Sequence, residues 1–256
     1  MAVYTYGAVT DRGDFREENQ DSILCVDGDV EGKETALFAV ADGMGGLSWG
    51  GQVSRYIAER FACWWNEDFP DMVRAGRDSS ADIRELLEQE IWDINQAVLQ
   101  FRKKEHCSCG STLSLLLLYG NRYFIENIGD SRVYLYRRGS LKRLTEDQSL
   151  VAQLVREGKM TEEEARRSSK KNKLTMCIGM FEIPQSYFVT GEWKPGDVFL
   201  LCSDGLYNPL LEEQLEQVLA RGEISAGERA QLLRNSVLPG DGRDNISAIV
   251  AEVLGK

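Results

Sequence analysis

Aspartates recur in this sequence beside short apolar runs, where carboxylates from different strands can meet. Asp42 closes LFAVAD, Asp204 closes VFLLCSD, and Asp244 precedes the last apolar run, NISAIVAEV. Asp21 follows REENQ, and Asp130 lies within NIGDSR. Each of these aspartates alone is typical of an ordinary turn after a strand. Brought to one edge of a sandwich, the same five side chains would form an acidic site.

An acidic cluster of this kind needs a counter charge. Two carboxylates about 4 Å apart repel each other by roughly 4 kcal/mol at an effective dielectric constant of about 20. Mg²⁺ and Mn²⁺ relieve that repulsion, because they prefer carboxylate and carbonyl oxygens and retain several waters. Two such ions can activate a water for in-line attack on phosphorus. His106 is the single histidine, which excludes sites built from several imidazoles and HExxH zinc proteolysis.

Short runs rich in β-branched and aromatic residues, bounded by Gly, Asp and Asn, predict the strands that must position these carboxylates. Helical spacing of apolar residues predicts two consecutive long helices, over 50–69 and 81–104. Strands in tight pairs, without alternating helices, favour antiparallel sheets. We therefore expect an α+β fold, a four-layer αββα sandwich with two antiparallel sheets flanked by helices. The predicted strands are 3–9, 22–26, 35–41, 111–119, 122–128, 131–137, 187–192, 197–203 and 246–253.

Residues 145–175 are polar and lie between predicted strands, so we expect a surface flap inserted in a single domain of residues 1–256. A short helix is expected at 149–156, and the capping-box pair Thr161 and Glu164 predicts the start of another. The basic residues of the flap are either a solvated face or a surface that steers an anionic partner. They are Arg166, Arg167, Lys170, Lys171 and Lys173.

The net charge and the lengths of the apolar runs argue against two classes of function, nucleic-acid binding and membrane insertion. A formal net charge of −11 disfavours nucleic-acid binding, and no apolar run is long enough to span a membrane. The first residues show no leader pattern and the six cysteines have no framework spacing, so we expect a cytoplasmic protein with reduced thiols. His106, Cys107 and Cys109, in HCSCG, could be half of a zinc site, but no second ligand pair accompanies them.

Six motifs together resemble the metal-dependent protein serine/threonine phosphatases of type 2C, especially the compact bacterial members. The resemblance covers essentially the whole chain, and the motifs occur in the family's order. They are R-x-x-N-Q-D (16–21), A-D-G-M-G-G (41–46), G-S-T (110–112), G-D-S-R (129–132), S-D-G-L (203–206) and G-R-D-N-I-S (242–247).

The resemblance implies a centre of two Mn²⁺ or Mg²⁺ ions between the sheets, with a weaker third ion possible. Asp42 would bridge both metals, and the carbonyl of Gly43 would bind one of them. Asp204 and Asp244 would hold the other metal. Asp130 matches the residue that helps to bind the third ion in bacterial relatives.

For the substrate, the resemblance implies hydrolysis of phosphoserine and phosphothreonine in proteins, in opposition to a serine/threonine kinase. Asp21 would act mainly through bound water, and Arg16 would hold the phosphate with its bidentate fork. We expect a monomer. Met44 replaces the proposed general acid of animal members, which implies proton donation by metal-bound water.

Three further positions depart from the family pattern. Asn208 stands where many members have another aspartate, which could weaken one metal or its water shell. Gln148 replaces a frequent histidine and Met176 a frequent arginine. These departures leave metal affinity and substrate choice open.

Two other interpretations remain. One is a pseudophosphatase, which would bind phosphoproteins or a kinase without turnover. Asn208 is compatible with this alternative, because the loss of an aspartate could weaken metal binding. Residues 46–50 match G-x-S-x-G, the nucleophile elbow of serine hydrolases, with Ser48 as nucleophile and His106 as its only possible histidine partner. That motif should sit directly at a strand-to-helix turn, whereas the strand is expected to end at Ala41.

Overall fold

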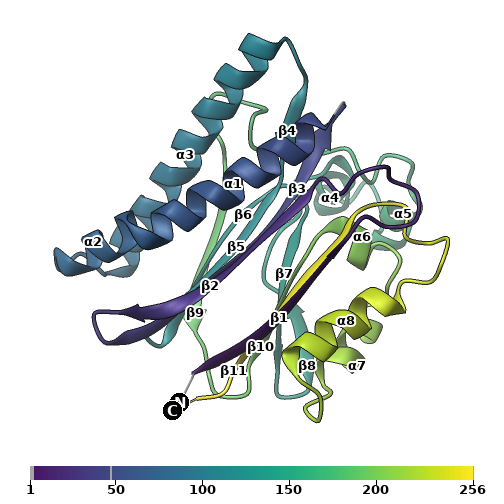
Figure 1. The fold of residues 1–256 in the computed structure, drawn as a ribbon. Coiled ribbons are helices and arrows are strands. Elements are labelled where there is room, and N and C mark those ends of the chain that lie inside the picture. Colours follow the sequence, from purple (N-terminus) through teal and green to yellow (C-terminus); the bar gives the residue numbers. More distant parts are fainter. Residues whose placement is uncertain (1–2, 47, 256) are drawn as a thin grey trace.

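Two antiparallel sheets lie face to face in the computed structural model, which describes residues 3–46 and 48–255, and helices cover both outer faces (Figure 1). All paired strands in the two sheets run antiparallel. The first sheet has the order β1 (Tyr4–Asp11), β11 (Ile246–Val253), β10 (Val198–Cys202), β7 (Arg132–Arg137) and β8 (Ser140–Arg143).

The second sheet contains the longest strand, β3, which pairs with three others. Its main order is β2 (Asp21–Val30), β3 (Lys33–Gly45), β5 (Leu113–Tyr119), β6 (Arg122–Ile128) and β9 (Tyr187–Glu192). The short strand β4 (Cys109–Ser111) pairs with the end of β3, beyond the point where β5 leaves it.

The helices form the two outer layers and the flap. On the second sheet lie α1 (Trp49–Asn66), α2 (Asp68–Arg74) and α3 (Ser80–Glu105), and on the first lie α6 (Asp204–Tyr207), α7 (Glu212–Leu219) and α8 (Ala226–Ser236). The flap holds α4 (Leu150–Arg156) and α5 (Glu162–Arg167). None of the described helices is both long and apolar enough to cross a bilayer.

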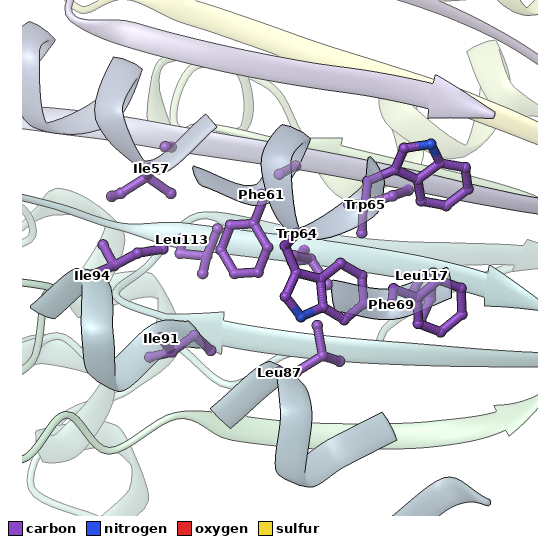
Figure 2. Close-up of a cluster of buried hydrophobic side chains, with 14 of the residues drawn as sticks. Ile57, Phe61, Trp64, Trp65, Phe69, Leu87, Ile91, Ile94, Leu113 and Leu117 are labelled. Atoms are coloured by element: carbon purple, nitrogen blue, oxygen red, sulfur yellow. The ribbon is translucent and has the colours of Figure 1, made fainter. Parts of the chain in front are cut away.

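Three apolar layers hold the sandwich together. One lies between the sheets, around Phe38, Leu116 and Phe199. Another lies under α7 and α8. The third lies under α1 and α3, where Figure 2 shows Phe61 beside Leu113, and where Trp64 stacks on Phe69 with ring centroids 5.0 Å apart. Burying such large side chains contributes roughly 2–3 kcal/mol each before entropy is counted.

The sequence predictions of the fold are largely confirmed. Every predicted strand region contains a strand, both long helices exist, and Ser149 and Thr161 cap α4 and α5. The strand predicted to end at Ala41 instead continues to Gly45, because β4 supplies it with a further partner.

Other boundaries also differ. The predicted helix over 50–69 breaks at Glu67, whose φ of −120° is not helical, so α2 is separate. The strand β8 and the helices α6, α7 and α8 were not predicted individually. The buried face of α8 consists of Ala226, Arg229, Ala230 and Leu233, a pattern too weakly apolar to stand out in the sequence.

Candidate active site and metal centre

Asp21 and Asp42 lie opposite each other on β2 and β3. Directly paired residues of antiparallel strands project to the same face with their Cβ atoms about 5 Å apart. Oδ2 of Asp21 accepts hydrogen bonds from the hydroxyls of Ser203 (2.8 Å) and Ser247 (2.7 Å), which belong to the other sheet's end. The two carboxylates therefore meet where the sheets face each other.

Asp204 and Asp244 reach the same place from the first sheet. Asp204 begins α6 directly after β10, and Asp244 lies just before β11, the neighbour of β10. Gly205 makes this approach possible, because a Cβ at that position would collide with the carbonyl oxygen of Asn245. The S-D-G and D-N motifs thus pack backbone against backbone.

Asp130 lies in the turn between β6 and β7, 6% exposed. The hydroxyl of Tyr207 donates to its carbonyl oxygen (2.9 Å), and the guanidinium of Arg132 stacks on the Tyr207 ring, 3.6 Å from its centroid. Arg132 also forms a buried bidentate ion pair with Asp147. This network fixes the turn and ties it to the root of the flap.

The pKa values show that these carboxylates share one site. Burial raises the pKa of Asp21 to about 6 and that of Asp130 to about 7. Burial, followed by the charge of Asp21, raises the pKa of Asp42 well above its usual value, with further contributions from Asp204, Asp130 and Asp244. Burial and then Asp130 do the same for Asp204. The site therefore carries an excess of negative charge.

The donor set fits hard divalent cations. Oδ1 of Asp21 and Oδ1 of Asp204 are buried and accept no hydrogen bond, although a carboxylate normally satisfies its buried oxygens. All the candidate ligands are oxygens, the type preferred by Mg²⁺ and Mn²⁺. Within residues 3–46 and 48–255, no three such side chains are arranged as a complete metal-ligand cluster, and protein donors bind some of the carboxylate oxygens.

Arg16 is one of those donors. Its Nε and Nη2 bind Oδ1 and Oδ2 of Asp244 at 2.9 and 2.8 Å. The fork that was expected to hold a phosphate therefore holds a carboxylate, an anion of similar geometry. Its side chain is 54% exposed, so it remains accessible from solvent.

The backbone around Asp42 is fixed on both sides. Its N–H donates to Oγ1 of Thr112 (3.0 Å), and its carbonyl accepts from Thr112 N–H (2.9 Å) and from Oγ of Ser111 (3.0 Å). Gly43 is tightly packed, because a Cβ there would collide with the carbonyl of Gly50. The segment from β4 to Thr112 thus positions Asp42.

Several positioning residues were not assigned roles from the sequence. Ser203 and Ser247 hold Asp21, as described above. The side chain of Asn245 accepts from Gln20 N–H and donates to the carbonyls of Arg12 and Glu18, so it fixes the loop that carries Arg16. The sequence signal that could have identified these residues is their position within the S-D-G and D-N-I-S motifs.

The three departures from the family pattern have structural roles. Nδ2 of Asn208 donates to Oδ2 of Asp204 (3.0 Å), leaving Oδ1 free for a cation. Gln148 binds Gly129 N–H and the carbonyl of Gln185. Met176 packs against the apolar layer under α1 and α3.

A cleft of about 1060 Å³ opens beside Asp130, between the flap and α6–α7. Asn208 and Tyr207 line one side, and Arg166 and Lys171 of the flap line the other. Lys171 lowers the pKa of Asp204, against the larger effects of burial and neighbouring carboxylates. Part of the flap's basic face therefore points toward the acidic site.

Ser48 caps α1 with a positive φ of 62°. Because β3 continues to Gly45, Ser48 is closer to a strand end than expected. However, none of the hydrogen bonds in the described parts of the chain joins Ser48 to His106, which caps the far end of α3. The geometry of a serine hydrolase is not assembled.

Comparison with known proteins gives consistent matches. A family model described as protein phosphatase 2C matches residues 16–235. The serine/threonine protein phosphatase PstP of Mycobacterium tuberculosis is 32% identical over 254 residues, 98% of this chain but 45% of that protein. The serine/threonine phosphatase stp of Listeria welshimeri is 31% identical over 247 residues, covering 95% of this chain and 93% of that protein.

A similar solved structure is the catalytic domain of PstP in complex with two manganese ions. It has a TM-score of 0.82 and 31% identity, and the match covers 98% of this chain and 99% of that one. This chain spans about half the length of the full mycobacterial relative.

Proposed function

This chain belongs to the protein phosphatase 2C family, and on that basis we propose that it hydrolyses phosphoserine and phosphothreonine in proteins. The observation that carries the proposal is the convergence of Asp21, Asp42, Asp204 and Asp244 from both sheets, with buried oxygens that lack partners. Two Mn²⁺ or Mg²⁺ ions are the proposed cofactors, in line with the two manganese ions of the similar PstP domain.

In the proposed site, Asp42, the carbonyl of Gly43, Asp204 and Asp244 would hold the two cations, with Asp42 serving both. Asp21 would orient water, and Asp130 would help to hold a weaker third cation. The chemistry that such cations supply when bound is charge neutralisation and a water acidic enough to attack phosphorus in line.

Side chains of this protein would bind the substrate phosphate and hold the candidate metal ligands in position. Arg16 binds Asp244 with a bidentate fork, and the same fork would match the oxygens of a substrate phosphate. Met44 has no acidic proton, so its side chain cannot protonate the leaving serine or threonine oxygen. Thr112 and Ser111 hold Asp42 in place throughout.

The decisive experiment compares Asp42→Asn with the unchanged protein. Phosphate release from a phosphothreonine peptide and from p-nitrophenyl phosphate would be measured in millimolar Mn²⁺. We expect a loss of more than about a hundredfold, because even partners behind a metal ligand are worth 10- to 100-fold. Asp29→Asn, on the exposed far end of the same hairpin, serves as the matched control and should keep full activity.

The rival function is phosphoprotein binding without turnover. It is favoured by one observation, the amide of Asn208 on Asp204 where many relatives have a carboxylate. No turnover above the Asp42→Asn background, together with retained binding of the phosphopeptide, would select this rival.

The proposal also covers the domain organisation, oligomeric state and compartment of the enzyme. We propose that residues 1–256 act as a single catalytic domain, as a monomer in the cytoplasm and in opposition to a serine/threonine kinase. Six unpaired cysteines support the reducing compartment. Gel filtration with light scattering tests the monomer.

A further inference from the structure

Two cysteines lie together at the end of α3, outside the proposed metal centre. Sγ of Cys107 and Sγ of Cys109 are 3.6 Å apart. Cys109 is buried and Cys107 half-buried. In the described residues, neither they nor His106 belong to a group arranged to hold a metal ion. The HCSCG motif therefore contains a pair of neighbouring thiols that has no role in the proposed phosphatase reaction.

The two thiols are suited to different steps of an oxidation. Cys107 follows the helix cap His106 and precedes β4, and its partial exposure admits a small peroxide. Burial and then the neighbouring Cys107 raise the pKa of Cys109 to about 12, so Cys109 remains a protonated thiol. The greater exposure of Cys107 suits it as the attacking sulfur, and the burial of Cys109 suits that residue as the resolving one.

Cys109 is directly linked to the strand that holds Asp42. It pairs with Gly45 in the β3–β4 ladder, where Met44 pairs with Gly110 and Gly43 with Ser111. Ser111 and the next residue, Thr112, bind the backbone of Asp42. A shift of Cys109 is therefore transmitted through three consecutive residues to Asp42.

We propose that Cys107 and Cys109 form an oxidisable pair that closes reversibly into a disulfide and thereby displaces β4 from Asp42. The Cys107 thiolate attacks a hydroperoxide: an S–O bond forms, the O–O bond breaks, and the leaving oxygen takes a proton to become water or an alcohol. The Cys109 sulfur then attacks the sulfenic sulfur, and the S–O bond breaks. The lost hydroxide takes the Cys109 proton as water.

Bond formation requires the sulfur atoms to close from 3.6 Å to about 2.05 Å. Cys109 is held in a ladder whereas Cys107 is not, so the movement is shared between the loop and β4. A bridge across a single residue is strained, which makes it easy to reduce. The pair therefore has the properties of a switch and not of a structural bridge.

Peptide mapping tests the pairing. Trypsin releases residues 105–122 as one peptide that contains both cysteines, while Cys177 lies in another peptide. After treatment with hydrogen peroxide and alkylation of free thiols, we expect the 105–122 peptide to be unalkylated and about 2 Da lighter. Dithiothreitol should restore both thiols. A cross-link to the Cys177 peptide, or sulfinic acid at Cys107, would overturn the proposal.

Hydrogen exchange and activity test the coupling to Asp42. Oxidation should speed exchange of the Thr112 amide, which is bonded to the Asp42 carbonyl, and lower phosphatase activity about fivefold or more, reversibly. Cys107→Ser should remove both responses while keeping basal activity. Cys63→Ser, at the exposed cysteine of α1, is the matched control and should keep them. A mapped disulfide without any change in exchange would refute the coupling even if the protein proved to have no phosphatase activity.

Discussion

Glu126 is a buried carboxylate outside the proposed metal centre, and its burial disfavours the charged form. It lies on β6 with no exposed surface, and neither of its oxygens has a partner in hydrogen-bonding geometry within the described chain. Burial raises its pKa to about 7, and the nearby Ser186 hydroxyl offsets this only in part. Unlike Asp21 and Asp204, it lies away from the acidic site, and the charge of Arg84 is the smallest of the influences on its pKa.

This raised pKa predicts a pH-dependent loss of stability. The folded protein binds the Glu126 proton more tightly than the unfolded chain, so the free energy of unfolding falls as pH rises from the ordinary value of 4.5 through about 7. Glu126→Gln should therefore raise the free energy of unfolding by about 1–3 kcal/mol at pH 8 and change it little at pH 4.5. Urea denaturation at both pH values measures this.

The matched control is Glu59→Gln, on the exposed side of α1, which should change stability by less than about 0.5 kcal/mol at either pH. An equal gain from Glu126→Gln at pH 4.5 and pH 8 would contradict the titration and indicate a packing effect.

Among the elements, the flap brings basic side chains to the cleft beside Asp130. Arg166 on α5 lines the cleft beside Asp130, whereas its neighbour Arg167 has an 80% exposed side chain paired with Glu163. A phosphopeptide continues beyond its phosphate and can extend along this cleft, which Arg166 and Asp130 both line, whereas p-nitrophenyl phosphate has no such extension.

Arg166→Glu should therefore raise KM for an acidic phosphopeptide by roughly threefold to tenfold and leave KM for p-nitrophenyl phosphate unchanged. Arg167→Glu is the control on the same helix, with little effect expected on either substrate. Steady-state kinetics with both substrates measures the difference. Equal effects of the two substitutions would mean that the cleft does not bind the peptide.

At the scale of the whole molecule, the proposed metal centre would join the two sheets. Asp21 and Asp42 come from the second sheet, and Asp204 and Asp244 come from the ends of strands in the first. Cations bound there would remove repulsion between carboxylates and connect the two halves of the sandwich. The stability of the fold should therefore depend on metal.

Adding Mn²⁺ to metal-free protein at about 100 times its Kd should stabilise the fold by about 2.7 kcal/mol. For a protein of this size, that corresponds to a rise in Tm of about 5–10 °C. Asp204→Asn should lose most of the rise, and Asp29→Asn should keep it. A Tm that does not change with Mn²⁺ would argue against an interface metal centre.

The sequence by itself determined what depends on neighbours along the chain. Short runs rich in β-branched and aromatic residues predicted the strands, apolar spacing predicted α1 and α3, and the capping pair Thr161 and Glu164 predicted α5. Local signals failed for α8, because its buried face includes two alanines and an arginine, and only the Ser225–Glu228 capping box marked its start. The motif order was enough to indicate the family and the acidic residues.

Only the tertiary structure decided which side chains meet. Ser203 and Ser247 bind Asp21 across 182 and 226 positions of sequence, and Arg16 binds Asp244 across 228. Such contacts depend on strand register and on the packing of two sheets, and no local pattern encodes them. The extension of β3 to Gly45 likewise required its partner β4. Residue types therefore indicate the proposed chemistry, and long-range packing determines the geometry of the site.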